Sequence, residues 1–159
     1  MKSRRLGNDG PEISVIGYGA WEASEHWGTV DEDAIIAAIH AALDAGVNWI
    51  DTAEVYGPHT SERIVGRAVA GRDGVLIATK VAPAPAGSGF DKDGIRRACE
   101  ASLARLGRDT IDLYQLHWPD QTVPVEESWE AMVMLADEGL VRWLGVSNFG
   151  KSLIERCEP

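Results

Sequence analysis

The stretch NWIDTAEVYG, residues 48–57, takes a short apolar segment directly into a carboxylate and then a tyrosine. Residues 47–50 are apolar and β-favouring apart from Asn48, which predicts a short buried strand. Asp51 then stands where that strand emerges, and Tyr56 follows in the next turn. This stretch therefore predicts a strand whose carboxyl end carries groups able to do chemistry.

Three later segments repeat this pattern, in which a predicted strand runs into a reactive or hydrogen-bonding side chain. In a parallel barrel the carboxyl ends of all strands lie on one face, where the active sites of that fold are built. We therefore expect the side chains that follow these strands to converge with Asp51 and Tyr56. The segments are residues 75–79 before Lys80, residues 111–116 before His117, and residues 141–146 before Ser147 and Asn148.

Amphipathic segments separate the predicted strands. The first helix is expected to begin at Thr29 and Glu32, which have capping-box spacing, and to end before Gly46. Further helices are expected from about Thr60, Asp91, Val125 and Lys151. The apolar face expected for the helix that starts at Val125 consists of Trp129, Met132, Val133 and Ala136.

The alternation of strands and helices implies βαβ crossovers and a parallel sheet, for which two architectures compete. A doubly wound Rossmann sheet would need G-x-G-x-x-G at the end of its first strand, and residues 17–22 (GYGAWE) lack the third glycine. Chemistry-bearing residues at successive strand ends favour a barrel instead. We expect an α/β fold of the (β/α)8 TIM-barrel type, here incomplete. Residues 1–159 would form one portion of it, with an N-terminal hairpin over residues 4–14 and about five βα units.

Composition and charge narrow the class of protein. Fifteen basic and 25 acidic residues give a net charge of -10, so we expect neither a nucleic-acid nor an anionic-membrane partner. Cys99 and Cys157 lack metal-type spacing, which predicts no metal site and no disulfide framework. No export signal and no stretch of membrane-spanning length is apparent, so a cytoplasmic location is expected.

Four short motifs then carry a resemblance to a known family. Residues 51–57 (DTAEVYG), 78–80 (ATK), 116–119 (LHWP) and 145–149 (GVSNF) together resemble the aldo/keto reductases in order and spacing. That family is an eight-stranded (β/α) barrel whose members reduce aldehydes and ketones with NADPH. The resemblance implies a catalytic tetrad of Asp51, Tyr56, Lys80 and His117. It also implies cofactor contacts from Asp51, Ser147 and Asn148, the last two holding the carboxamide.

The chemistry is consistent with these residue types. Hydride delivery to a carbonyl carbon leaves an alkoxide that needs a proton, and a phenol supplies it best when its pKa of about 10 moves toward neutral. We expect Lys80 to stabilise the tyrosinate of Tyr56, and Asp51 to hold Lys80 in place. His117 would hydrogen-bond and orient the carbonyl oxygen. The cofactor, NADPH with NADH not excluded, would supply the hydride.

Each assignment has a structural alternative. Asp51 taken alone could be a turn residue, Lys80 a solvated lysine, Tyr56 a barrel wall and His117 a satisfied buried histidine. Their occurrence together at matched strand ends favours the catalytic interpretation. Ser147 and Asn148 could equally cap the helix that follows them. Trp21 and Trp118 are expected to form an apolar wall for a carbonyl substrate next to His117, with core packing as the alternative.

Length is where the chain departs from the family, because a complete barrel takes roughly 250 residues. The expected units that bind the adenosine 2′-phosphate and close the substrate site lie outside residues 1–159. Three functions therefore stay open: an NADPH-dependent carbonyl reductase, a non-catalytic barrel acting as a regulatory or interaction subunit, and an inactive truncated fragment. An incomplete barrel also predicts self-association through its open edge.

Overall fold

The computed structural model describes residues 1–24, 28–57 and 59–157. It opens with an antiparallel hairpin of β1 (Ser3–Arg5) and β2 (Glu12–Ser14), which confirms the predicted N-terminal hairpin. A five-stranded sheet follows, in which each strand pairs in parallel with the strand before it. Its strands are β3 (Tyr18–Gly19), β4 (Trp49–Asp51), β5 (Leu76–Val81), β6 (Ile111–Leu116) and β7 (Val141–Val146).

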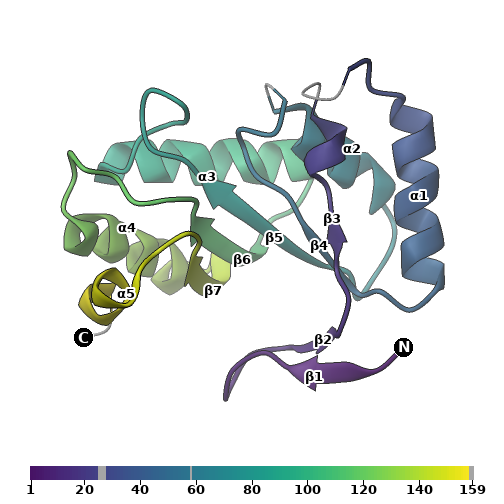
Figure 1. The fold of residues 1–159 in the computed structure, drawn as a ribbon, viewed down its shortest axis with the longest axis horizontal. Helices are drawn as coiled ribbons and strands as arrows, with labels where there is room; N and C mark the ends of the chain where they lie inside the picture. The colour runs from purple at the N-terminus through teal and green to yellow at the C-terminus, as the bar shows by residue number, and fades with distance from the viewer. Residues whose placement is uncertain (25–27, 58, 158–159) are drawn as a thin grey trace.

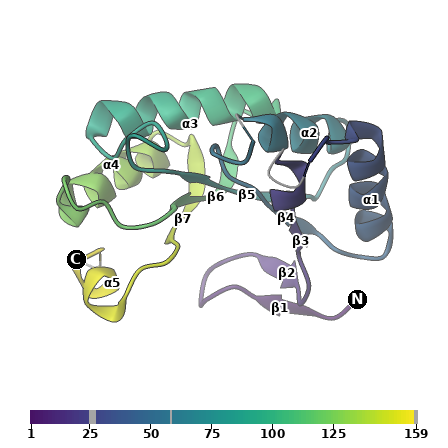
Figure 2. The same ribbon diagram turned by 45° about the horizontal axis from the view of Figure 1, so that its top comes forward.

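Helices follow the strands of the sheet and cover its outer side. Figures 1 and 2 show the first four α-helices on one side of the sheet, with the hairpin and the last helix on the other. This sequential, all-parallel order with crossover helices is part of a (β/α)8 barrel, as predicted. The helices are η1 (Trp21–Ala23), α1 (Glu32–Asp44), α2 (Thr60–Ala68), α3 (Lys92–Leu106), α4 (Val125–Asp137) and α5 (Lys151–Cys157).

The main core lies between the sheet and these helices. Successive strand residues point to opposite faces, so alternate residues of β4, β5 and β6 face outward. Ile50, Ile77, Tyr114 and Leu116 are at most 1% exposed there. They pack in one cluster with apolar residues of the covering helices, such as Ile95 of α3. Burial of these side chains in one continuous layer is what holds the βα units together.

A buried ion pair also ties this layer together. The side chain of Glu62 in α2 is fully buried, and its Oε2 accepts a hydrogen bond of 2.6 Å from Arg105 Nε in α3. Its other oxygen, Oε1, accepts from Thr79 Oγ1 in β5 at 2.6 Å. Arg105 also donates to Ser102 Oγ at 3.0 Å. Both oxygens of the buried carboxylate are therefore satisfied, which a charge at this depth requires.

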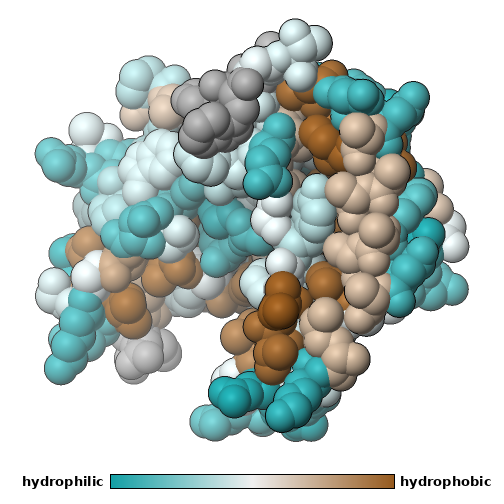
Figure 3. All heavy atoms as spheres, turned by 45° about the vertical axis from the view of Figure 1, so that its right-hand side comes forward, coloured by the Kyte–Doolittle hydropathy of each residue, from teal (hydrophilic) through white to brown (hydrophobic). Residues whose placement is uncertain are grey.

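The inner face of the sheet is covered by fewer side chains than the outer face. A hollow of about 220 Å³ lies between this face and the hairpin, lined by Leu6 and Ile13 from the hairpin and by Leu113 and Trp143 from the strands. The hairpin is fastened below the sheet by Trp49, whose Nε1 donates to the carbonyl of Ser14 at 3.0 Å. Figure 3 shows apolar atoms on the surface near this end of the molecule. Exposed apolar side chains there include Leu6, Val15 and Ile16.

Two boundary predictions are wrong. The predicted strand of residues 15–19 is reduced to Tyr18–Gly19, and Val15 and Ile16 are 49% and 61% exposed. The reason is a local turn, because Ser14 Oγ donates to the carbonyl of Ile16 at 2.7 Å. Helix α1 is capped by Asp31, which accepts from the amide of Ala34 at 3.0 Å, and not by Thr29.

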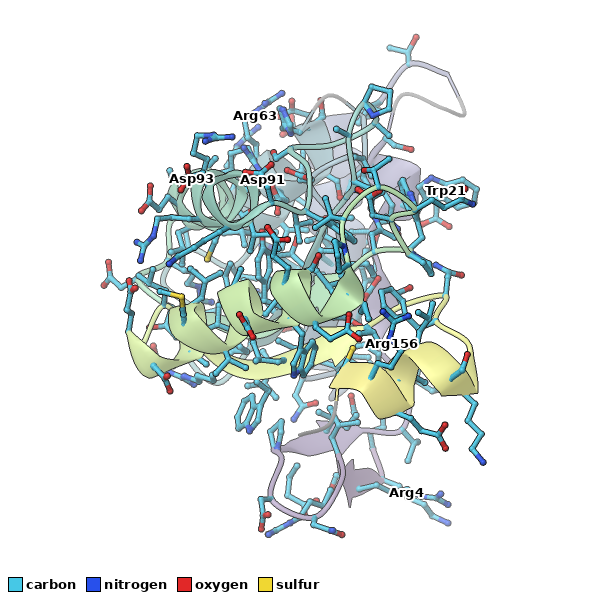
Figure 4. The ribbon with its side chains drawn as sticks, turned by 90° about the vertical axis from the view of Figure 1, so that its left-hand side faces the viewer. Arg4, Trp21, Arg63, Asp91, Asp93 and Arg156 are labelled. Carbon is cyan, nitrogen blue, oxygen red and sulfur yellow. The ribbon has the colours of Figure 1, made fainter. Side chains whose placement is uncertain are left out.

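The predicted face of α4 is also wrong in part. Met132 is buried as expected, but Val133 is 39% exposed. The buried side of the helix is formed by Val125, Ser128, Ala131, Met132 and Leu135. On this side, Ser128 Oγ donates to the carbonyl of Phe90, just before α3, at 3.2 Å. Helix α5 is held against α4 by Arg156, whose guanidinium pairs with Glu126 at 2.6 Å (Figure 4).

Within residues 1–24, 28–57 and 59–157, no helix combines the length and the apolar run that crossing a bilayer requires.

Candidate active site

The carboxyl ends of β4 and β5 bring a carboxylate and an ammonium group together. Asp51 is the last residue of β4, and Lys80 lies one residue before the end of β5. Lys80 Nζ donates to Asp51 Oδ1 at 2.5 Å and to the carbonyl of Thr52 at 2.9 Å. Lys80 is 5% exposed, so its charge is largely removed from water and is balanced by Asp51. This pair forms the floor of the site.

Tyr56 lies above this floor in the segment that follows β4. The amide of Tyr56 donates to the carbonyl of Ala53 at 3.1 Å, and the carbonyl of Tyr56 accepts from the amide of Ser61 at 3.1 Å. These bonds fix the turn between the strand end and the first turn of α2. Lys80 Nζ then lies over the tyrosine ring, 5.3 Å from its centroid. Half-buried Tyr56 is therefore held in contact with the ion pair.

The predicted lowering of the Tyr56 pKa is wrong for this structure. Burial raises the pKa of Tyr56 above its ordinary value of 10.0, and the negative charge of Asp51 raises it further. The physical reason is geometric: Lys80 faces the ring and donates its hydrogen bonds to Asp51 and Thr52, so its charge is already compensated. Tyr56 is consequently a protonated phenol at neutral pH.

His117 completes the group from the end of β6. Its amide donates to the carbonyl of Val81 at 2.9 Å, and its ring meets that of Tyr56 edge-on with the centroids 5.6 Å apart. Burial, followed by the nearby charge of Lys80, lowers the pKa of His117 to about 4. Its Nδ1 is buried and has no hydrogen-bond partner among the described residues. The imidazole is therefore neutral at physiological pH and has one ring nitrogen unused.

Ser147 and Asn148 follow β7 and lie next to His117. Asn148 adopts a left-handed conformation, with φ 62°, and its Nδ2 donates to the carbonyl of His117 at 2.9 Å and to Ser147 Oγ at 3.0 Å. Within the described part of the chain, neither side chain bonds to the amides of α5. Their hydrogen bonds thus connect the ends of β6 and β7, in contrast to the capping alternative.

The two predicted wall residues lie differently. Trp118 stacks at a tilt on His117, with ring centroids 4.4 Å apart, so the structure brings it to the site. Trp21 begins η1 directly after β3, at the same end of the sheet, and is 49% exposed. Figure 4 shows its indole projecting outward from the body of the molecule. Its place in a substrate wall stays a prediction.

The structure adds a residue to which the sequence analysis gave no role. Glu54 lies between Asp51 and Tyr56, is 1% exposed, and accepts three hydrogen bonds from the segment that follows β5. The available sequence signal was a carboxyl group inside the motif of residues 51–57, next to a loop of small residues at 83–89. Of the described His, Cys, Asp and Glu side chains, no three are grouped so that they could hold a metal ion.

Comparisons with known proteins agree with this geometry. The sequence model of the aldo/keto reductase family matches residues 15–159. The chain is also 44% identical over 157 residues to aldo-keto reductase YhdN of Bacillus subtilis strain 168, which covers 94% of this chain and 47% of that protein. The chain therefore belongs to the aldo/keto reductase family. It spans about half the length of this relative.

Solved structures give the same result for the fold. A thermostable aldo-keto reductase, Tm1743, in complex with the inhibitor epalrestat, superposes with a TM-score of 0.89 at 34% identity. The match covers 99% of this chain and 57% of that one. An aldo-keto reductase from Klebsiella pneumoniae in complex with NADPH superposes with a TM-score of 0.85 at 38% identity, over 98% of this chain and 52% of that one. The five βα units thus correspond to about half of these barrels.

Proposed function

We propose that the protein containing this chain reduces aldehydes or ketones to alcohols with a reduced nicotinamide cofactor, and that Tyr56 is the proton donor. The observation that carries the proposal is that Tyr56 contacts both Lys80 of the Asp51–Lys80 pair and the ring of His117. These residues come from three strand ends on the face where barrel enzymes build their active sites.

The residues at the end of β7 fit a nicotinamide carboxamide, which offers both an N–H donor and a carbonyl acceptor. Because Ser147 Oγ accepts from Asn148 Nδ2, its own proton is free to be donated. Asn148 Oδ1 has no hydrogen-bond partner among the described residues and is free to accept. Asp51 uses only Oδ1 for Lys80, so that its Oδ2 can accept from a cofactor hydroxyl. This donor and acceptor set supports cofactor binding by Asp51, Ser147 and Asn148.

The bound nicotinamide would supply the hydride for the carbonyl carbon. The protein's own task is to handle the carbonyl oxygen, which gains negative charge as the hydride arrives. Tyr56 would transfer its hydroxyl proton to that oxygen. Its raised pKa keeps the proton in place until the oxygen becomes an alkoxide, which is far more basic than a phenol. The proton transfer is therefore favourable despite the raised pKa.

Two neighbours support this step. Neutral His117 carries one N–H, which can donate to the carbonyl oxygen and orient it toward Tyr56. After the transfer Tyr56 is an anion, and Lys80 is the nearby cation that stabilises it. Trp118, stacked on His117, would bound the substrate on its apolar side, with Trp21 as a second wall. We propose NADPH as the cofactor, on the support of the NADPH complex of the Klebsiella pneumoniae relative.

The test is made on the purified full-length protein. Oxidation of NADPH should require an added aldehyde or ketone, with one alcohol formed for each NADPH consumed. The double variant of Ser147→Ala and Asn148→Ala should raise the Kd for NADPH by at least about tenfold, since two hydrogen-bonding groups are lost. Cofactor oxidation without a carbonyl compound, or no oxidation across a broad panel of carbonyls, would contradict the proposal.

A further inference from the structure

Glu54 is a buried carboxyl group that joins two loops at the active-site end of the sheet. Its Oε1 accepts from the amides of Ala82 at 2.8 Å and Ser88 at 3.1 Å. Its Oε2 accepts from the hydroxyl of Ser88 at 2.8 Å. Glu54 is 1% exposed, so its carboxyl group is removed from water and these three donors supply its hydrogen bonds instead. The turn after β4 is thereby bonded to the loop after β5.

The backbone of Glu54 is fixed as firmly as its side chain. Its amide donates to the carbonyl of Lys80 at 3.2 Å, and its carbonyl accepts from His59 Nδ1 at 2.7 Å. Glu54 therefore contacts the strand that carries Lys80 and also the residue that precedes α2. It lies two positions before Tyr56, inside the turn that presents the phenol.

The loop after β5 is shaped to approach Glu54 closely. A Cβ atom on Gly87 would lie 2.5 Å from Glu54 Oε1 and 2.5 Å from the carbonyl oxygen of Ala82. Such distances are far below van der Waals contact, so only glycine permits this approach. The sequence therefore supplies glycine at the point where the loop wraps the carboxyl group.

We propose that Glu54 is a positioning residue that fixes Tyr56 over Lys80. This inference rests on the proposed function. The separation of the Tyr56 ring from Lys80 depends on how residues 53–57 sit against β5 and the loop after it. The amide of Glu54 bonds to β5 at Lys80, and its side chain supplies the three bonds to the loop. Small displacements of a reacting group cost large factors in rate. Loss of the three bonds should therefore lower turnover more than cofactor binding, because none of the three donors belongs to Asp51, Ser147 or Asn148.

The experiment compares variants of the full-length protein. Glu54→Ala removes all three acceptor contacts. Glu54→Gln keeps Oε1 for the two amides and can donate its NH₂ to Ser88 Oγ, so it should restore function. Asp91→Ala is the matched control, because Asp91 caps α3 through the amide of Gly94 at 3.0 Å and is not among the hydrogen-bond partners of the Glu54 carboxyl group in the described residues. It also lies near the loop after β5, and it should cost comparable stability without touching the Tyr56 turn.

Three readouts are taken: kcat, the Kd for NADPH, and amide hydrogen exchange of residues 53–57. Glu54→Ala should lower kcat by about tenfold or more, with the Kd within about twofold of native. Amide hydrogen exchange of residues 53–57 should become faster in Glu54→Ala. Glu54→Gln and Asp91→Ala should keep kcat within about twofold of native, and neither should speed this exchange.

A folded Glu54→Ala protein with native kcat would overturn the proposal, and so would an equal loss of kcat in Asp91→Ala. If Glu54→Ala fails to fold, Ser88→Ala carries the test, since it removes one bond and should lower kcat by about threefold. Native kcat and native exchange in Ser88→Ala would then overturn it. Tyr56→Phe is assayed in parallel: if that variant keeps its turnover, the proposed function fails, whereas the exchange data still decide whether Glu54 fixes the turn.

Discussion

The two faces of the sheet differ in how far they are completed by this chain. On the outer face, β5 and β6 lie beneath the covering helices (Figure 2), and their residues Ile77 and Tyr114 are at most 1% exposed. On the inner face, Leu113 and Trp143 are only partly buried and border a hollow of about 220 Å³. The outer layer is a finished core. The inner face supplies the polar site but not all of the side chains that would enclose it.

Thr79 and Lys80 show this division at neighbouring positions. Thr79 points outward and donates to buried Glu62, and Lys80 points inward and donates to Asp51. Because consecutive residues of a strand face opposite sides, one peptide unit separates a stabilising contact from a proposed catalytic one. The difference teaches that stability and chemistry can be altered separately in this molecule.

The largest effect is expected when the inner face is left open. A polypeptide of residues 1–159 alone should show no turnover and little binding of NADPH. A few hundred Å² of unburied apolar surface costs several kcal/mol at about 25 cal/mol per Å². Five of the eight strands of such a barrel also leave two sheet edges open to self-association. Quenching of tryptophan fluorescence measures NADPH binding, NADPH oxidation measures turnover, and gel filtration measures self-association.

Co-expression with the C-terminal half of a relative should restore cofactor binding and turnover. A monomer of residues 1–159 that oxidises NADPH on its own would show that the inner face needs no completion.

Lys80→Met should lower kcat at neutral pH by about 10³-fold in the full-length protein. Asp51, left without its partner, would raise the pKa of Tyr56 further and leave the product tyrosinate without a cation. The pH dependence of kcat should therefore shift to higher pH. Lys92→Met, at an exposed lysine of α3, is the control and should behave as native. An unchanged pH profile in Lys80→Met would remove Lys80 from the mechanism.

Acidification should destabilise the protein through His117. Its folded-state pKa of about 4 lies below the ordinary 6.5, so the unfolded state binds the proton more readily between these values. The free energy of unfolding is therefore unaffected by His117 above about pH 6.5. It decreases as the pH falls toward 4, by an amount on the order of 3 kcal/mol. Urea unfolding at several pH values measures it. The loss of stability on acidification should be smaller in His117→Gln. An identical pH dependence of stability in the two proteins would show that His117 is not the group responsible.

Thr79→Val should have the smallest effect and should act on stability alone. The variant keeps the shape of the side chain but leaves Glu62 Oε1 without a donor, which costs about 1–2 kcal/mol. Turnover should stay native, because Lys80 and its partners on the other face are untouched. Urea unfolding and kcat are measured on the same preparation. A loss of kcat as large as that of Lys80→Met would show that the two faces are not separable.

The sequence was most informative where hydrophobic pattern and turn residues agree. Strands β6 and β7 begin and end as predicted, and Gly107 follows α3 in the left-handed conformation that glycine favours. Their boundaries are set by local signals. The start of α1 was misplaced because Thr29 and Asp31 are both good capping residues, and in the structure Asp31 is the cap.

The site was predictable as a set of residues but not in its electrostatics. The strand ends indicated which side chains would meet, since parallel strands end on one face. They indicated that Asp51 would hold Lys80 near Tyr56, but not that Lys80 would face the tyrosine ring and also donate to the carbonyl of Thr52. The direction of the Tyr56 pKa depends on that approach. Glu54 was missed for a similar reason, because its partners lie 28 and 34 residues away in sequence.

The most direct measurement of the central claim is the turnover of Tyr56→Phe in the full-length protein. Phenylalanine keeps the ring that contacts Lys80 and His117 and removes only the hydroxyl that would donate the proton. NADPH oxidation with an aldehyde should fall by about 10³-fold or more, while the Kd for NADPH stays native. A variant that keeps most of its turnover would contradict the account and remove Tyr56 from the reaction.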